Sequence, residues 1–179
     1  MAGFADLDDD VAAATGESFS KEQLPDGEYT VEVEKGESKE VKKAVIVTLY
    51  LKLLDGGPKL QGRIFQHQYW LVSMDGSKSE SQINQLKKDL NTIGFNLDAY
   101  HEAGQKFSMV VGKTMLAVNG MKLAVKKSSK VADPLPGKAP RTFHNVYVNK
   151  RLPEDGKPTK VSLAELEELA KAAAPADPF

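Results

Sequence analysis

The feature that most constrains the fold is a change of hydrophobic period along the chain. The segments 28–34, 43–54 and 62–71 alternate apolar with polar residues or are rich in β-branched ones, which predicts three successive β-strands. From residue 80 to residue 93 the apolar side chains instead recur every three or four positions, as they do on one face of an amphipathic helix. Residues 98–110 indicate a second, weaker helical stretch.

The segments that follow predict further strands. Two short runs, 113–118 and 121–127, flank Asn119-Gly120. Asn-Gly between alternating runs is the strongest local signal for a β-hairpin, because both residues accept a positive φ. The Ser-, Lys-, Pro- and Gly-rich segment 128–140 is expected to be a loop, and 141–149 is expected to be the last strand.

The order of three strands, a helix, a strand pair and a last strand predicts a mainly β protein. It is typical of an OB-fold-like Greek-key barrel of five to six strands, with a helix between the third and fourth strands. Another small β-barrel, or an antiparallel sheet capped by a helix, fits the same order. The barrel is expected at residues 24–151, after a disordered acidic arm at 1–23. Residues 152–179 are expected to form a linker, a short helix opened by a capping box at Ser162, and a tail.

The residues that could support catalysis or bind a metal are not grouped. The chain has no cysteine, which excludes disulfides and cysteine-ligated zinc, and its three histidines lie at no metal-binding spacing. No phosphate-cradling glycine loop or Ser/His/Asp arrangement is recognisable, so we expect neither an enzyme nor a cofactor. No stretch approaches the roughly 18 apolar residues of a membrane span, and no signal peptide is recognisable, so the expected location is the cytoplasm.

Charge is distributed unevenly, although the net charge is −1. Residues 113–151 contain nine lysines and arginines and one acid. Residues 1–20 contain five acids and no cation, and residues 152–179 contain six acids and three lysines. A basic body between acidic ends suits a protein that holds phosphates. A solvated lysine-rich face accounts for the same charges equally well.

Strand parity predicts which side chains face a ligand. Non-specific binding of single-stranded DNA needs cations for the backbone and aromatic rings for the bases. We expect Val146 and Val148 in the core, which directs Phe143, Asn145 and Tyr147 outward. The candidate DNA-contacting residues are Tyr50, Lys52, Arg63, Trp70, Lys122, Lys126, Lys127, Arg141, Phe143, Tyr147, Lys150 and Arg151. A second core layer of aromatic residues and a solvated turn of lysines are the alternatives.

The third predicted strand is the most ambiguous of the set. We expect Phe65, Tyr69 and Leu71 to be core residues, which leaves Trp70 at or near the surface. A lone tryptophan in a strand is more often a core residue than a stacking platform. The sequence therefore does not decide which face of this strand meets a nucleic acid.

Five short motifs are spread over residues 20–150. They are Leu24-Pro25-Asp26-Gly27-Glu28-Tyr29, Gly62-Arg63, the helix end from Leu90 to Phe95, Val111-Gly112-Lys113, and Phe143-His144-Asn145-Val146. Together they resemble a phage family of small single-stranded-DNA-binding proteins. The resemblance implies an OB-type barrel used in phage DNA replication or recombination, in the cytoplasm of an infected bacterial host.

The sequence finishes with Ala176-Asp177-Pro178-Phe179, which resembles the acidic Pro-Phe tip of bacterial-type single-stranded-DNA-binding proteins. In that family the terminal Phe and its carboxylate dock into pockets on DNA-processing enzymes. The resemblance implies that Asp177, Pro178 and Phe179 recruit a replication or recombination protein. An apolar anchor beside negative charges suits a basic-rimmed hydrophobic pocket.

The function expected from the sequence is therefore binding of single-stranded DNA with little sequence preference, with partners recruited by the tip. A homo-oligomer is compatible with this function. The rival is a small β-barrel interaction module that binds a host or phage protein through exposed aromatic residues. Salt separates the two, because phosphate binding weakens steeply as salt rises whereas an apolar interface barely responds.

Overall fold

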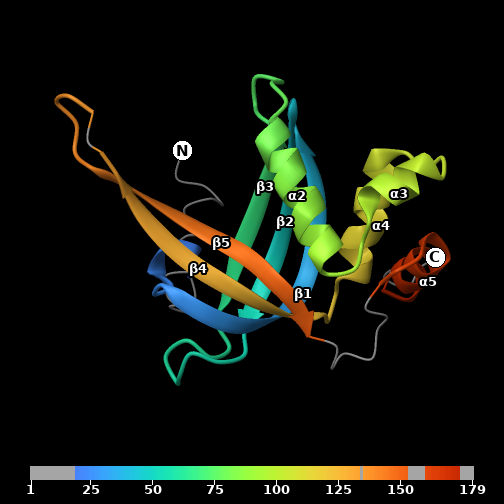
Figure 1. Cartoon of the computed structure of the whole chain (residues 1–179), viewed down its shortest axis with the longest axis horizontal. Helices are drawn as coiled ribbons and strands as arrows, with labels where there is room; N and C mark the ends of the chain where they lie inside the picture. Colours follow the sequence, from blue (N-terminus) through green and yellow to red (C-terminus); the bar gives the residue numbers. More distant parts are fainter. Residues whose placement is uncertain (1–18, 134, 153–159, 174–179) are drawn as a thin grey trace, which may run out of the picture.

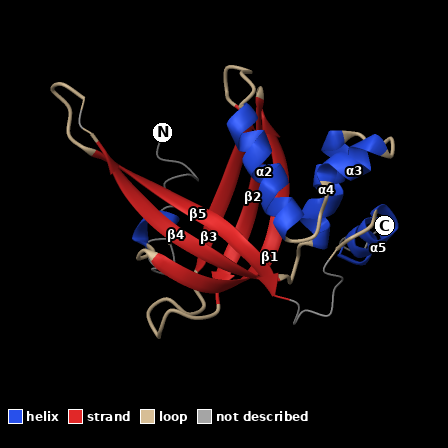
Figure 2. Ribbon diagram, viewed as in Figure 1, coloured by secondary structure: helices blue, strands red, loops and turns tan. Residues whose placement is uncertain are grey.

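An antiparallel sheet of five strands forms the centre of the protein. The computed structural model describes residues 19–133, 135–152 and 160–173. The strands are β1 (Gly27–Val41), β2 (Ala44–Leu53), β3 (Ile64–Val72), β4 (Lys122–Ala132) and β5 (Arg141–Leu152). Their order is β3-β2-β1-β4-β5, and every neighbouring pair is antiparallel (Figure 1, Figure 2). The predicted mainly β class is confirmed.

Short helices pack against this sheet or against one another. In the described part of the chain they are the 3-10 helix η1 (Lys21–Gln23) and the α-helices α2 (Glu80–Thr92), α3 (Leu97–Glu102), α4 (Phe107–Ala117) and α5 (Leu163–Ala173). The helix expected at 80–93 is confirmed as α2, whose N-cap Ser79 accepts a hydrogen bond from the backbone N–H of Gln82. The stretch 98–110 holds parts of two helices instead of one, because Gly104 turns the chain with a φ of 93° between α3 and α4.

One face of the sheet carries the hydrophobic core. Its buried strand residues are Val31, Val33, Val47, Leu49, Leu51, Leu53, Phe65, Tyr69, Leu71, Leu123, Val125, Val146 and Val148. Helix α2 adds Leu86 and Leu90 to the same cluster and packs against β3 and β5. The parity predicted for the third and last strands is confirmed. Each such side chain contributes roughly 1.5–3 kcal/mol when it is fully buried.

The strand predicted at 113–118 and the hairpin predicted at Asn119-Gly120 are wrong. Residues 113–117 belong to α4, which packs against β1. Gly36 of β1 permits this contact, since a Cβ there would lie 2.7 Å from the carbonyl oxygen of Met115. Helix α4 is apolar on nearly all sides, so its sequence shows no clear period, and packing against β1 decides its conformation.

Asn119-Gly120 connects α4 to β4. Gly120 has a φ of 82° and donates its backbone N–H to the Val33 carbonyl at 2.7 Å. The backbone N–H of Val33 in turn bonds to Met121 at 2.8 Å. The turn therefore starts the pairing of β4 with β1. Gly120 has the expected positive φ and Asn119 does not, and the turn lies between a helix and a strand instead of between two strands.

A long β4–β5 hairpin projects from the body of the molecule (Figure 1). The loop expected at 128–140 is shorter than predicted, because β4 continues to Ala132 and pairs with the start of β5. Ser128 lies opposite Asn145 and Ala132 lies opposite Arg141. Cross-strand hydrogen bonds thus order a segment whose composition is typical of a loop.

Strands β3 and β5 are the two edges of the sheet, and no ladder joins them in the described residues. Helix α2 packs against both edges, and so does η1. Residues 19–23 of the expected disordered arm are therefore in contact with the sheet, with Phe19 partly buried against the core. The rest of that arm and the linker residues 153–159 lie outside the described residues.

The helix expected after Ser162 is confirmed as α5, and it packs against α4. The capping box is present, since the Ser162 hydroxyl accepts from the Glu165 N–H at 3.2 Å and the Glu165 carboxylate accepts from the Ser162 N–H at 3.3 Å. Leu166 is fully buried. Val161 donates its backbone N–H to Gly94 at 2.8 Å, which ties the start of α5 to the body. None of the helices in the described ranges is long and apolar enough to cross a membrane.

Candidate nucleic-acid interface

The outer face of the sheet, opposite the core, exposes aromatic rings at both edges. On β5, Phe143 is 50% exposed and Tyr147 is 43% exposed. On β3, Trp70 is 38% exposed. Strand parity correctly predicted that these three side chains are exposed. Rings that are accessible in this way can stack on nucleobases.

Three cations flank the two rings of β5. The register places Lys130 opposite Phe143 and Lys126 opposite Tyr147, and Arg141 precedes Phe143 by two residues on the same face. All five side chains are exposed. Together, Lys126, Lys130, Arg141, Phe143 and Tyr147 form the hairpin strip. Its two rings are four positions apart, which is about 13 Å along β5.

The cations of the hairpin strip form no ion pair with any described residue. Glu28 of β1 is the acid nearest to them in the register, opposite Lys126. No acid is paired with Lys130 or Arg141 along the β4–β5 ladder. Their charges are therefore available to an incoming phosphate.

The predicted residues on β2 already have partners on β1. The Lys35 ammonium lies 4.6 Å from the centre of the Tyr50 ring, and the Tyr50 hydroxyl donates to Glu37 at 3.2 Å. Lys52 pairs with Glu34 at 3.6 Å. Burial of the phenol, followed by its hydrogen bond to Glu37, raises the pKa of Tyr50 above its usual value. These five residues are called the paired patch.

Trp70 lies in a row of uncharged side chains along β3. Its indole N–H donates to Gln68 Oε1 at 3.3 Å, and Gln68 Nε2 donates to Gln66 Oε1 at 3.3 Å. This row offers a ring and amide groups to a ligand, with no cation of its own. It is on the opposite edge of the sheet from the hairpin strip.

Lys127 is a structural cation at the base of the hairpin. It is 2% exposed, and its Nζ lies 3.1 Å from Asp26 Oδ1 and 2.9 Å from His144 Nδ1. Asp26 Oδ2 also accepts from the hydroxyl of Ser129 at 2.7 Å and from its N–H at 3.1 Å. The Ser129 hydroxyl, followed by Lys127, lowers the pKa of Asp26. Burial and these partners make Lys127 inaccessible to a phosphate in solvent.

The remaining predicted cations are dispersed. Lys122 and Lys150 lie on the outer face at the other end of β4 and β5 from the hairpin loop, and Lys150 is exposed. The Arg63 guanidinium lies 5.5 Å from the centre of the Phe19 ring. Arg151 is partly buried opposite Leu123, on the core side of the sheet. Of these four cations, only Lys122 and Lys150 extend the outer basic surface.

Sequence reasoning missed Lys130, because a loop was expected at 128–140 and parity has no meaning in a loop. It also missed the role of Asp26, whose only sequence signal is its place in the turn before β1. The predicted partner-binding residues Asp177, Pro178 and Phe179 lie outside the described residues. Within those residues, no group of three or more His, Asp or Glu side chains is placed to hold a metal ion.

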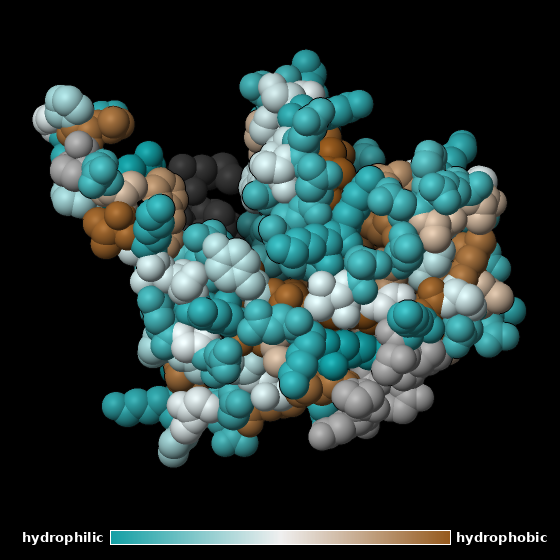
Figure 3. Space-filling view, in the orientation of Figure 1, coloured by the Kyte–Doolittle hydropathy of each residue, from teal (hydrophilic) through white to brown (hydrophobic). Residues whose placement is uncertain are grey.

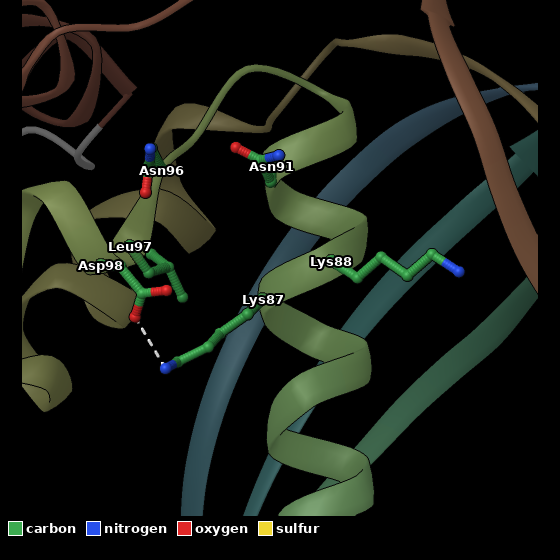
Figure 4. A pocket seen from close by; sticks show the side chains of 6 residues that line it. All are labelled: Lys87, Lys88, Asn91, Asn96, Leu97 and Asp98. Atoms are coloured by element: carbon green, nitrogen blue, oxygen red, sulfur yellow. Dashed lines mark ion pairs between the residues drawn. The ribbon is translucent and has the colours of Figure 1, made fainter.

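A polar hollow of about 300 Å³ lies between α2 and α3, away from the hairpin strip (Figure 4). Its lining residues are Lys87, Lys88, Asn91, Asn96, Leu97 and Asp98. Lys87 pairs with Asp98 at 2.7 Å, while Lys88 extends from α2 in another direction (Figure 4). The pairing neutralises the charge nearest the hollow, so we do not assign a ligand to it.

A comparison with protein families identifies one matching model, described as DUF669, protein of unknown function, over residues 9–159. The chain belongs to the DUF669 family. The match covers all five strands and α2 to α4, and it ends before α5. No curated protein and no solved structure matches the chain. Membership of DUF669 thus applies to the sheet with its hairpin strip, and it names no activity.

Proposed function

We propose that this DUF669 protein binds single-stranded DNA, with little sequence preference, through the outer face of β4 and β5. The observation that carries the proposal is the hairpin strip, in which two exposed rings alternate with three cations that have no acidic partner among the described residues. Stacking is worth about 1–3 kcal/mol per base and accepts any base. The cations attract the phosphates between the stacked bases.

The architecture that we propose is an OB-type barrel left open between β3 and β5. The strand order, the antiparallel pairing and a helix between β3 and β4 support it. An OB-fold is a partly open Greek-key barrel that binds oligonucleotides on its strands and on the loop between strands four and five. The long β4–β5 hairpin occupies the place of that loop.

Action in phage DNA replication or recombination is part of the same proposal. It rests on the resemblance of the motifs between residues 20 and 150 to phage single-stranded-DNA-binding proteins. In that role the protein would cover and protect the strand. Recruitment of a replication or recombination protein through Asp177, Pro178 and Phe179 stays a prediction from the sequence.

A second function, binding of a protein partner, is favoured by one observation. The hairpin exposes Val131 at 64% and Leu135 at 59%, in addition to Phe143. Apolar residues on the projecting hairpin are visible in Figure 3. Exposed apolar residues that gather on one element mark protein interfaces. A partner that contacts these residues would bind with little dependence on salt.

Fluorescence anisotropy with a labelled dT oligonucleotide and a matched duplex separates the two functions. We expect tight binding to the single strand and weak binding to the duplex. Three phosphate contacts give a slope of about −2 in log K against log salt, so affinity should fall roughly thirty-fold between about 50 and 300 mM salt. Absence of binding at the lower salt concentration would overturn the DNA proposal and leave the protein interface.

A further inference from the structure

A pocket of about 260 Å³ opens at the seam between the edge strands β3 and β5. It is lined by residues of η1, β3, α2 and β5, among them His67, Gln68, Gln82, Gln85, Asn145 and Tyr147. Tyr147 belongs to the hairpin strip, so the pocket is continuous with the proposed DNA-binding surface. We call it the seam pocket.

His67 is the unusual residue of the seam pocket. It is 7% exposed, and neither ring nitrogen has a hydrogen-bond partner in the described residues. Its Nε2 lies 3.8 Å from Asp89 Oδ2, too far for a hydrogen bond. Asp89 is instead engaged by the Tyr69 hydroxyl at 2.5 Å and by Gln85 Nε2 at 2.8 Å. Buried polar atoms normally have partners, so this imidazole is placed to gain one from a ligand.

The residues that line the seam pocket indicate which kind of ligand it can bind. Lys21 is the only cation among the lining residues, and the Asp89 carboxylate lies behind His67, so the pocket does not suit a phosphate. Glutamine and asparagine amides both donate and accept hydrogen bonds, as a neutral imidazole does through its two nitrogens. Such groups match the edge of a neutral, planar heterocycle, and the Tyr147 ring at the margin offers a stacking face.

The geometry points to the seam pocket as a binding site for one nucleobase of the bound single strand. The base would turn away from the hairpin strip beside Tyr147, enter between β3 and β5, and meet the amide groups and His67. A small rotation of the imidazole toward the pocket supplies the missing partner. This inference rests on the proposed function, and it adds a site that holds a base by its edge.

The test uses the full chain with ¹⁵N-labelled histidine and long-range ¹H–¹⁵N NMR of the imidazole nitrogens. The probes are a dT oligonucleotide and an abasic oligonucleotide of the same length, which presents phosphates without bases. We expect the His67 nitrogens to shift with dT and to stay unchanged with the abasic strand. His101, exposed on α3, serves as the internal control and should respond to neither.

The variant His67→Phe provides a second readout. The ring stays aromatic and the unpartnered nitrogens are removed, so the melting temperature should not fall. Affinity for dT should fall about five-fold, while affinity for the abasic strand stays within two-fold. His101→Phe is the matched control and should leave both affinities unchanged.

The outcomes separate the two proposals. If dT binds but the His67 nitrogens do not shift, or His67→Phe binds dT as wild type does, the seam pocket holds water alone and the inference is wrong while the proposed function stands. If dT does not bind the wild-type protein at low salt, the proposed function and the inference both fail.

Discussion

The hairpin strip and the paired patch lie on the same outer face of one sheet and contain the same types of residue, lysines beside aromatic rings. In the paired patch, Lys35 covers Tyr50, Glu37 holds its hydroxyl, and Glu34 pairs with Lys52. In the hairpin strip the corresponding groups are exposed and have no acidic partner among the described residues. The difference comes from the neighbouring strand, because β1 supplies glutamates to β2 whereas β4 supplies lysines to β5.

A surface of aromatic residues and cations is not by itself a binding site. Side chains that already satisfy one another must break those contacts before they bind a ligand, and exposed ion pairs, though individually weak, still neutralise charge. We therefore assign the binding energy to the hairpin strip and a minor contribution to the paired patch.

Replacing both rings of the hairpin strip should have the largest effect. Phe143→Ala with Tyr147→Ala removes two stacking contacts of about 1–3 kcal/mol each, so dT affinity should fall about thirty-fold or more. Tyr50→Ala in the paired patch is the matched control and should change affinity less than about three-fold, since its ring is already covered. Anisotropy titration measures both, and equal losses would remove the distinction between the two surfaces.

Neutralising the cations should have the next largest effect. The triple variant Lys126→Gln, Lys130→Gln, Arg141→Gln should lower dT affinity about ten-fold at low salt and reduce the salt slope by about two. The matched control is Lys35→Gln with Lys52→Gln, which removes cations that already face glutamates. A salt slope that drops as much in the control as in the triple variant contradicts our assignment.

Removing the acids of the paired patch should have a smaller effect, of opposite sign. Glu34→Gln with Glu37→Gln frees Lys52, Lys35 and Tyr50, so affinity for dT should rise about three-fold at low salt and become more salt-dependent. The difference in dT binding between the hairpin strip and the paired patch would then become smaller, as expected if the glutamates cause that difference. Glu22→Gln with Glu102→Gln, which changes two exposed acids outside the sheet, controls for net charge. Unchanged affinity in the first variant would show that the glutamates are not what keeps the paired patch inactive.

Asp26→Asn should affect binding least and stability most directly. It removes the carboxylate that faces the buried Lys127 ammonium and Ser129, so the melting temperature should fall while dT affinity changes less than about two-fold. The lowered pKa of Asp26 sets the sign of the pH dependence. Its stabilisation is fully present above the ordinary value of 3.8 and is lost as pH falls through the lower, folded-state pKa.

Thermal unfolding of wild type and Asp26→Asn across pH measures this directly. The difference in melting temperature should be constant above about pH 5 and should shrink below the ordinary carboxyl pKa. Asp75→Asn is a useful reference, because Asp75 has a pKa lowered to about 2 by the Ser73 and Ser77 hydrogen bonds but lies away from the hairpin. A difference for Asp26→Asn that persists unchanged into acid would contradict the role assigned to its charge.

Much of the sheet was predictable from residue patterns because alternation reports burial on one face. The alternation correctly separated the buried Val146 and Val148 from the exposed Phe143 and Tyr147. It also separated the buried Tyr69 from the exposed Trp70. Helix α2 was predictable from its 3.6-residue period and helix α5 from its capping box. These signals are local, so one sequence is enough to contain them.

The candidate site was only partly predictable. Lys127 was placed among the contact residues because its charge suits phosphate, yet it follows the inward parity of Val125 and is buried. Lys130 was not recognised, because composition at 128–140 indicates a loop. His67 and Asp89 were not recognised as neighbours, since they come from different elements and no local pattern links them.

By itself, the sequence determined most of the strands, the amphipathic helices, the exposed aromatic rings and the concentration of cations after residue 112. The tertiary structure decided that 113–117 is helical and that β4 continues through a loop-like segment. It also decided that Lys35 and Lys52 form ion pairs with glutamates, whereas Lys126, Lys130 and Arg141 form none with a described residue. The physical reason is that propensity and period describe a residue's own segment. Which strand lies alongside, in which register, depends on the whole sheet, and the register sets the charge that each exposed side chain meets.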